Sequence, residues 1–160
     1  MPETLSARTR KRLNIQGLTD VGDDVLVPVA PWLRMAFGGC ALLAATGTAL
    51  ASPTILWVST LVAAFGTLFH VHPFDLIYNH GIRYLRNTGP LPRRAAPTRF
   101  ACAIGVGWLI ATALAFQSGL LAWGYVLGAA LTSVAGLVAT TDICIPSMIY
   151  NALFLRTKAG

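Results

Sequence analysis

The chain has 160 residues, of which 55% are hydrophobic and only 11% are charged, and its formal net charge is +6. Because an average soluble domain is about 25% charged, this composition indicates an integral membrane protein. The apolar segments leave no soluble domain on which the basic residues could form a nucleic-acid surface, so we expect no nucleic acid to bind.

Residues 1–30 are expected to form a cytoplasmic arm rather than a domain, with a short helix over residues 4–13. Three aspartates follow the basic start of the arm, and Pro28 and Pro31 separate it from the apolar sequence. An anionic leaflet attracts basic side chains but repels aspartates, so we expect the arm to become ordered when a partner protein binds. The predicted partner- or lipid-binding residues of the arm are Arg8, Arg10, Lys11 and Arg12.

Four apolar segments follow, close in length to the roughly 20 helical residues that cross a hydrocarbon core of about 30 Å. They cover residues 32–51, 54–70, 100–117 and 120–141. The sequence before Ser52 resembles a signal-peptidase site, but the acidic arm and the apolar segment that follows at once favour a retained span. The sequence therefore predicts an all-α integral membrane protein with a four-helix transmembrane domain over residues 31–160.

Each pair of spans is followed by a segment that is expected to form a short helix along the membrane surface. In residues 73–86, Pro73 suits a first helical turn, and apolar and polar side chains alternate at helical spacing. A shorter segment over residues 147–156 has a similar pattern. We expect both helices to lie in the membrane interface.

Lysine and arginine are confined to the arm, the starts of the first and third spans, the middle connection and the C-terminal end. Because cytoplasmic loops carry the excess of these residues, both termini are predicted to be cytoplasmic. The two halves also share an Ile-Tyr-Asn sequence, at residues 77–79 and 149–151. This similarity predicts two hairpins related by an axis along the membrane normal.

Three sequences, HPFDLIYNHGIRYL, PLPRRAAPTRFAC and CIPSMIYN, carry a family resemblance. Over residues 53–154 the chain resembles the bacterial inner-membrane family known as domain of unknown function 4395. The resemblance implies a small multi-span protein of the inner (cytoplasmic) membrane without an assigned activity. The arm before Pro31 lies outside it.

A few side chains near the predicted cytoplasmic interface could carry chemistry. Thiolates and imidazoles bind soft metal ions, and a thiol near arginines can be activated. The candidates for a thiol or metal site are Cys102, Cys144, His70 and His72. No metal-ligand spacing such as CxxC or HxxxH is present, so these residues are more often structural. No cofactor is required by the sequence, although His70 could ligate a pigment or haem.

The sequence contains no recognisable catalytic apparatus and no ionisable residue at the centre of a span. We therefore expect a non-enzymatic accessory or assembly subunit that docks a larger membrane complex. The alternatives are a thiol-based carrier of sulfur or redox equivalents at the cytoplasmic face and a transporter of small solutes. The docking surface is predicted to include Tyr78, Asn79, Arg83, Arg86, Tyr150 and Asn151. Small residues in the spans, such as Gly124-x3-Gly128, are expected mainly to pack the bundle internally.

Overall fold

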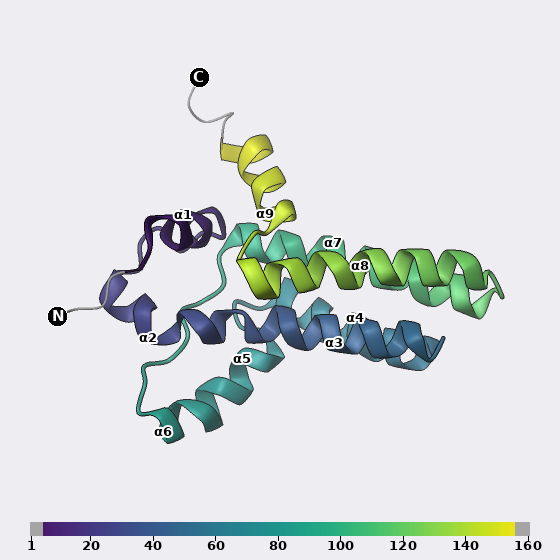
Figure 1. Ribbon diagram of the computed structural model, residues 1–160, viewed down its shortest axis with the longest axis horizontal. Coiled ribbons are helices and arrows are strands. Elements are labelled where there is room, and N and C mark those ends of the chain that lie inside the picture. The colour runs from purple at the N-terminus through teal and green to yellow at the C-terminus, as the bar shows by residue number, and fades with distance from the viewer. Residues whose placement is uncertain (1–4, 156–160) are drawn as a thin grey trace.

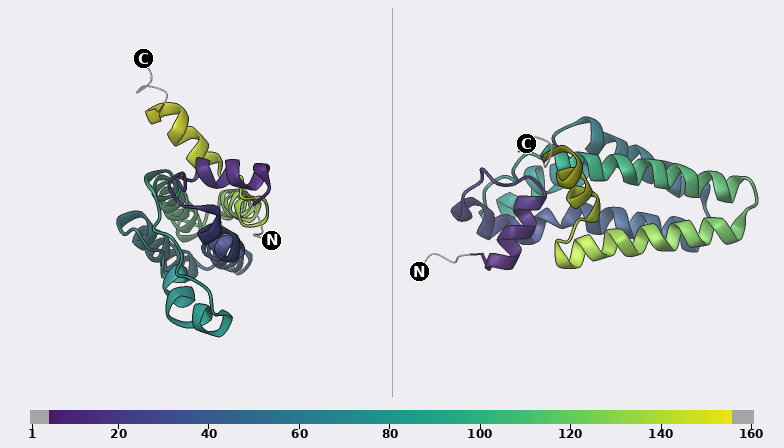
Figure 2. Two further views of the ribbon diagram at one scale, coloured as in Figure 1. Left: turned by 90° about the vertical axis from the view of Figure 1, so that its left-hand side faces the viewer. Right: turned by 90° about the horizontal axis from the view of Figure 1, so that it is seen from above.

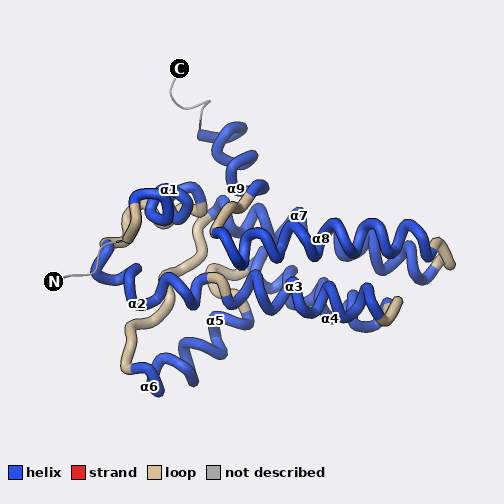
Figure 3. The backbone as a smooth tube through the Cα atoms, viewed as in Figure 1, coloured by secondary structure: helices blue, strands red, loops and turns tan. Residues whose placement is uncertain are grey.

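The computed structural model describes residues 5–155, and all regular structure in this range is helical, as predicted (Figures 1 and 3). Four helices form a bundle: α3 (Met35–Ala49), α4 (Pro53–Leu68), α7 (Ala96–Gln117) and α8 (Leu121–Thr141). Three helical stretches are long and apolar enough to cross a membrane: Asp23–Ala49, Ala96–Gln117 and Leu121–Thr141. The shorter α4 reaches that standard only together with the bent segment that follows it.

Short signals set the ends of the bundle helices. The Ser52 hydroxyl accepts a hydrogen bond from the backbone N–H of Ile55, and Pro53 begins α4, where its missing N–H costs no helical hydrogen bond. Between α7 and α8, Gly119 has a φ of +76°, a conformation that favours glycine. Both hairpin turns lie at the same end of the bundle (Figure 1).

The bundle helices pair mainly between the hairpins, since α3 packs most extensively against α8 and α4 against α7. Leu56, Ala113 and Phe116 belong to the core of the bundle. Glycine permits the closest approaches: a methyl group at Gly124 would overlap the Phe116 ring, and one at Gly128 would overlap Thr48. The expectation that these two glycines pack the bundle internally is confirmed.

Two arginines join the hairpins at one end of the bundle. Arg34, just before α3, pairs with the carboxylate of Asp142 and donates to the carbonyl oxygen of Thr140, beside the end of α8. Arg99, in the first turn of α7, donates to the carbonyl oxygens of Thr67 and Leu68 at the end of α4. Cations at helix C-termini satisfy carbonyl groups that lack helical partners.

Two helical segments leave this end of the bundle, as predicted. The first consists of α5 (Pro73–Ile77), η1 (Tyr78–Ile82) and α6 (Arg83–Arg86), and it turns by 79° from α4. The second consists of α9 (Ile145–Tyr150) and η2 (Asn151–Leu155). Seen along the bundle, they point in opposite directions (Figure 2, left). Arg156, the last residue of the second predicted surface helix, lies outside the described residues.

The arm differs from the prediction because it is folded against the rest of the chain. It contains α1 (Ala7–Ile15) and α2 (Asp23–Leu33), and Pro28 and Pro31 lie inside α2 instead of ending it. Leu13 and Leu26 are almost completely buried and belong to the same apolar cluster. Val29 belongs to a second cluster, which contains Tyr78. Burial of this apolar surface offsets the backbone hydrogen bonds that the prolines remove.

Candidate functional site

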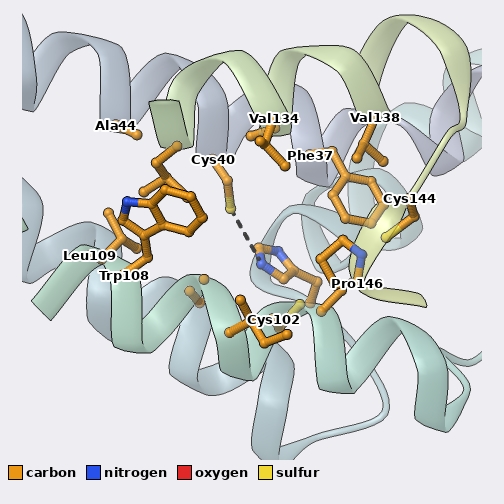
Figure 4. A pocket seen from close by; sticks show the side chains of 17 residues that line it. Phe37, Cys40, Ala44, Cys102, Trp108, Leu109, Val134, Val138, Cys144 and Pro146 are labelled. Atoms are coloured by element: carbon orange, nitrogen blue, oxygen red, sulfur yellow. Dashed lines mark hydrogen bonds between the residues drawn. The ribbon is translucent and has the colours of Figure 1, made fainter. Parts of the chain in front are cut away.

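All three cysteines and His72 line one cavity of about 110 Å³, which we call the thiol cavity (Figure 4). It lies between α3, α7 and α8, near the end of the bundle where the surface helices leave. The other lining residues are Phe37, Ala44, Ala63, Ala101, Ile104, Gly105, Trp108, Leu109, Leu131, Val134, Ala135, Val138 and Pro146. The indole N–H of Trp108 is already bonded to the carbonyl oxygen of Leu127. The wall of the cavity is therefore mainly apolar, and the imidazole of His72 is a polar group within it.

His72 is held in one orientation. Its side chain is 1% exposed, and its Nδ1 accepts a hydrogen bond of 3.4 Å from the backbone N–H of Phe74. In the neutral ring the proton then resides on Nε2, which lies 3.6 Å from the sulfur of Cys40 (Figure 4). Burial, together with the charge of Arg94, lowers the pKa of His72 to about 4. The imidazole is therefore a neutral donor that faces the cavity.

A buried ion pair fixes the turn that carries His72. Arg94 donates to both carboxylate oxygens of Asp75, at 2.6 and 2.7 Å, and both side chains are almost completely enclosed. The same carboxylate accepts a hydrogen bond of 3.0 Å from the backbone N–H of His72. Burial alone would lower the pKa of Arg94, but the hydrogen bond and charge of Asp75 outweigh it and raise that pKa.

Two glycines make room for the His72 side chain. A methyl group at Gly66 would overlap the imidazole and would lie 3.4 Å from the sulfur of Cys102. A methyl group at Gly39 would overlap the ring of Phe74, which stacks on His72 with 5.5 Å between ring centroids. The imidazole is therefore enclosed by close packing as well as by hydrogen bonds.

The three thiols share the cavity with a single imidazole. Within residues 5–155, no three histidine, cysteine or acidic side chains are grouped closely enough to hold a metal ion. Cys144 is 2% exposed and accepts a hydrogen bond of 3.0 Å from the hydroxyl of Ser147. Burial nevertheless raises the pKa of the Cys144 thiol. Since the thiolate is the reactive form, this environment disfavours nucleophilic chemistry at Cys144.

His70 lies apart from the thiol cavity. Its side chain is exposed, and its Nε2 lies 3.3 Å from the guanidinium of Arg99. The two histidines therefore do not act together, and the suggestion that His70 ligates a pigment or haem stays a prediction.

The arm forms a second feature, which we call the basic groove, with a volume of about 260 Å³. It is lined by Arg8, Lys11, Arg12, Ile15, Asp142, Ile143, Cys144 and Met148. Arg12 also donates to the carbonyl oxygen of Thr141. Arg10 is turned away from the groove, because it donates to the carbonyl oxygen of Val21 and pairs with Asp23. Three of the four predicted basic residues thus share one surface.

The expected Tyr-Asn docking surface is largely internal. Tyr78 is completely buried beside Trp32, and its hydroxyl bonds to that of Thr88 at 2.6 Å. The Asn79 side chain accepts from the backbone of Leu91. Placing Tyr78 on an exposed face was therefore wrong, because α2 covers that side of the helix.

The equivalent residues of the second surface helix also make internal contacts. Asn151 donates to the carbonyl oxygen of Ile15 in α1, and Tyr150 packs on Phe100 with 5.4 Å between ring centroids. The guanidinium groups of Arg83 and Arg86 lie over the rings of Tyr84 and Trp32, respectively.

The candidate residues chosen from the sequence did not include Cys40 or Asp75, and the sequence did not predict the pairing of Asp75 with Arg94. The sequence His-Pro-Phe-Asp does hold a local signal, because His72 and Asp75 occupy the two positions of a capping box at the start of α5. No sequence signal marks the contact between Cys40 and His72, which depends on how α3 packs against the turn after α4.

These features define a class: an all-helical protein with membrane-length apolar helices and a buried imidazole and three thiols around one apolar cavity. A model of the family described as Domain of unknown function (DUF4395) matches residues 30–154, so the chain belongs to this family. The match begins earlier than the expected residue 53, and residues 1–29 lie outside it. No curated protein and no solved structure matches the chain.

Proposed function

We propose that this protein is a non-enzymatic subunit of the bacterial inner membrane that assembles with another integral membrane protein. In this proposal α3, α4, α7 and α8 are four spans, both termini are cytoplasmic, and the two hairpins are repeats around an axis along the membrane normal. The corresponding contacts of Arg34 and Arg99 support the repeat, since each connects the start of one hairpin to the end of the other.

The observation that carries the proposed assembly is a row of small residues on the outer face of α7. Ala103, Gly107 and Ala111 recur every fourth residue and are all exposed, and a methyl group at Gly107 would meet no atom within 4 Å. A glycine inside a helix costs about 1 kcal/mol relative to alanine, and Gly107 gains no packing contact from residues 5–155 in return. Small residues at this spacing allow a second transmembrane helix to approach closely.

The surface helices and the basic groove support attachment at the cytoplasmic face. Ile77 and Leu85 are 55% and 87% exposed on the segment that turns away from the bundle, as expected for side chains that enter the membrane interface. Arg8, Lys11 and Arg12 offer cations to anionic lipid head groups at the same end of the molecule.

Site-specific photo-cross-linking in native membranes tests the proposed assembly. A photoreactive amino acid at Gly107 should give a discrete adduct with a different membrane protein, whereas the same amino acid at Leu61, 72% exposed on α4, should not. Equal adducts at both positions, no adduct at Gly107, or an adduct of two copies of this chain would each contradict the proposal.

The convergence of three thiols on one cavity keeps a thiol-based carrier as a second candidate. Under the favoured proposal, Cys102→Ala and Cys144→Ala leave cellular sulfur and redox phenotypes unchanged. Loss of such a phenotype in a variant that still inserts at the normal level would place the carrier first.

A further inference from the structure

The thiol cavity contains a donor without a strong acceptor. The Nε2–H of His72 has the Cys40 sulfur at 3.6 Å as its partner, and a thiol sulfur accepts hydrogen bonds weakly. Buried polar groups in native proteins nearly always have a hydrogen-bond partner, protein or water. His72 is almost completely buried and faces an apolar cavity, so its N–H is suited to an incoming acceptor.

The volume and the apolar wall of the cavity limit the size and the charge of a ligand that could bind there. An apolar cavity of about 150 Å³ holds a benzene ring, so the thiol cavity, at about 110 Å³, is close to the size of one ring. Its apolar lining would leave a charged guest without compensation. A methyl group at Gly105 would meet no atom within 4 Å, so there is additional room along the α7 wall.

The location of the cavity indicates where the guest comes from. Most of its wall belongs to the apolar helices α7 and α8, both of membrane length. A molecule that partitions into the bilayer reaches these helices without crossing a polar layer.

We propose that the thiol cavity binds an uncharged, lipid-soluble molecule whose ring-sized head carries a carbonyl group, as a quinone head group does, and that His72 Nε2–H donates to this carbonyl. Asp75 and Arg94 fix the turn, and the Phe74 N–H fixes the tautomer, so the donor is oriented before the ligand arrives. This binding is independent of the proposed assembly through α7.

Two small probes of equal shape test the recognition of the carbonyl. Acetophenone has a ring and one carbonyl, and α-methylstyrene replaces that oxygen with a CH2 group. The protein is labelled with 5-fluorotryptophan and placed in nanodiscs, and the ¹⁹F signal of Trp108, assigned by its loss in Trp108→Phe, reports occupancy. With concentrations expressed per lipid, acetophenone should bind about 3- to 10-fold more tightly than α-methylstyrene, because one hydrogen bond contributes a difference of this size.

Substitutions test the hydrogen bond from His72 and the volume of the cavity independently. His72→Asn retains an acceptor for the Phe74 N–H, but its side chain is too short to place a donor at the Nε2 position, because its amide NH2 takes the place of the ring edge that lies against Gly66. The preference for acetophenone should therefore disappear. Gly105→Leu should fill the cavity and abolish the saturable Trp108 shift for both probes. Gly136→Leu in α8 is the matched control, because a methyl group there would meet no atom of the described residues within 4 Å and Gly136 does not line the cavity; it should leave both affinities unchanged.

Three results would overturn the proposal. These are the absence of a saturable shift at Trp108 with either probe, equal affinity of the two probes for the unaltered protein, and a preference for acetophenone that persists in His72→Asn.

Discussion

Asp75 and Arg94 form an ion pair that the protein encloses almost completely, with 5% and 7% of their side chains exposed. Removal of one charge from a buried pair leaves the other uncompensated and costs about 3–5 kcal/mol. We therefore expect Asp75→Asn to lower the unfolding temperature in detergent sharply. Asp23→Asn is the control, because its pair with Arg10 is partly exposed to solvent and contributes less than about 1 kcal/mol. Similar losses in both variants would show that Asp75 is not enclosed as described.

The lowered pKa of His72 predicts that stability falls in acid. The folded chain keeps the imidazole neutral down to a pH of about 4, whereas the unfolded chain takes up the proton near its ordinary pKa of 6.5. The contribution of the neutral imidazole to the free energy of unfolding is therefore fully present above about pH 7, and it is lost as the pH falls from 6.5 toward 4. Each pH unit within this window costs up to about 1.4 kcal/mol.

The measurement is the unfolding temperature at pH 7.5 and pH 5, compared between the unaltered protein and His72→Asn. Asparagine does not titrate and retains the cap on the Phe74 N–H, so the variant should lose less stability between the two pH values. An identical loss in both proteins would assign the acid sensitivity to other groups.

At the scale of elements, α1 is attached to the bundle mainly by polar contacts. The Gln16 side chain, 6% exposed, donates to the carbonyl oxygen of Asp142, and Asn151 donates to that of Ile15. Loss of one such hydrogen bond costs about 1 kcal/mol, so Gln16→Ala should raise amide hydrogen exchange in residues 7–15 about fivefold. Arg8→Ala, at an exposed position of α1, should leave exchange unchanged. Equal exchange in both variants would mean that α1 is held by other contacts.

The four bundle helices and the two helical segments that follow them could be predicted because their signals are local. Apolar length gives the spans, and proline with helical periodicity gives the segments that begin at Pro73 and Ile145. The folded structure of the arm could not be predicted from local signals. Pro28 and Pro31 are ordinary helix breakers, and only the packing of Leu26 and Val29 against distant parts of the chain explains why α2 forms.

The candidate site was predicted only in part, because some of its contacts join residues that are distant in the sequence. His72, Cys102 and Cys144 were found by residue type, but Cys40 joins them only because α3 places it against the turn after α4. The buried state of Tyr78 depends on α2, a helix that the sequence did not indicate. Local sequence thus predicts elements, whereas the pairing of distant side chains requires the packed molecule.

The two ends of the bundle differ in composition, which bears on how the whole molecule is oriented in a membrane. The hairpin turns lie at one end, and the surface helices, the arm and the middle connection lie at the other (Figures 1 and 2). The basic residues of the arm and of the middle connection lie at this second end, which predicts that it faces the cytoplasm.

Labelling of introduced cysteines in intact cells with a reagent that does not cross the membrane tests this arrangement most directly. The positions are Leu50 and Ser118 at the two hairpin turns and Gly89 in the exposed middle connection, with the unaltered protein as the control for its own thiols. We predict that Leu50→Cys and Ser118→Cys are labelled from outside and that Gly89→Cys is labelled only after the cells are opened. Labelling of Gly89→Cys in intact cells, or opposite results at the two turns, would contradict a four-span bundle with both surface helices at the cytoplasmic face.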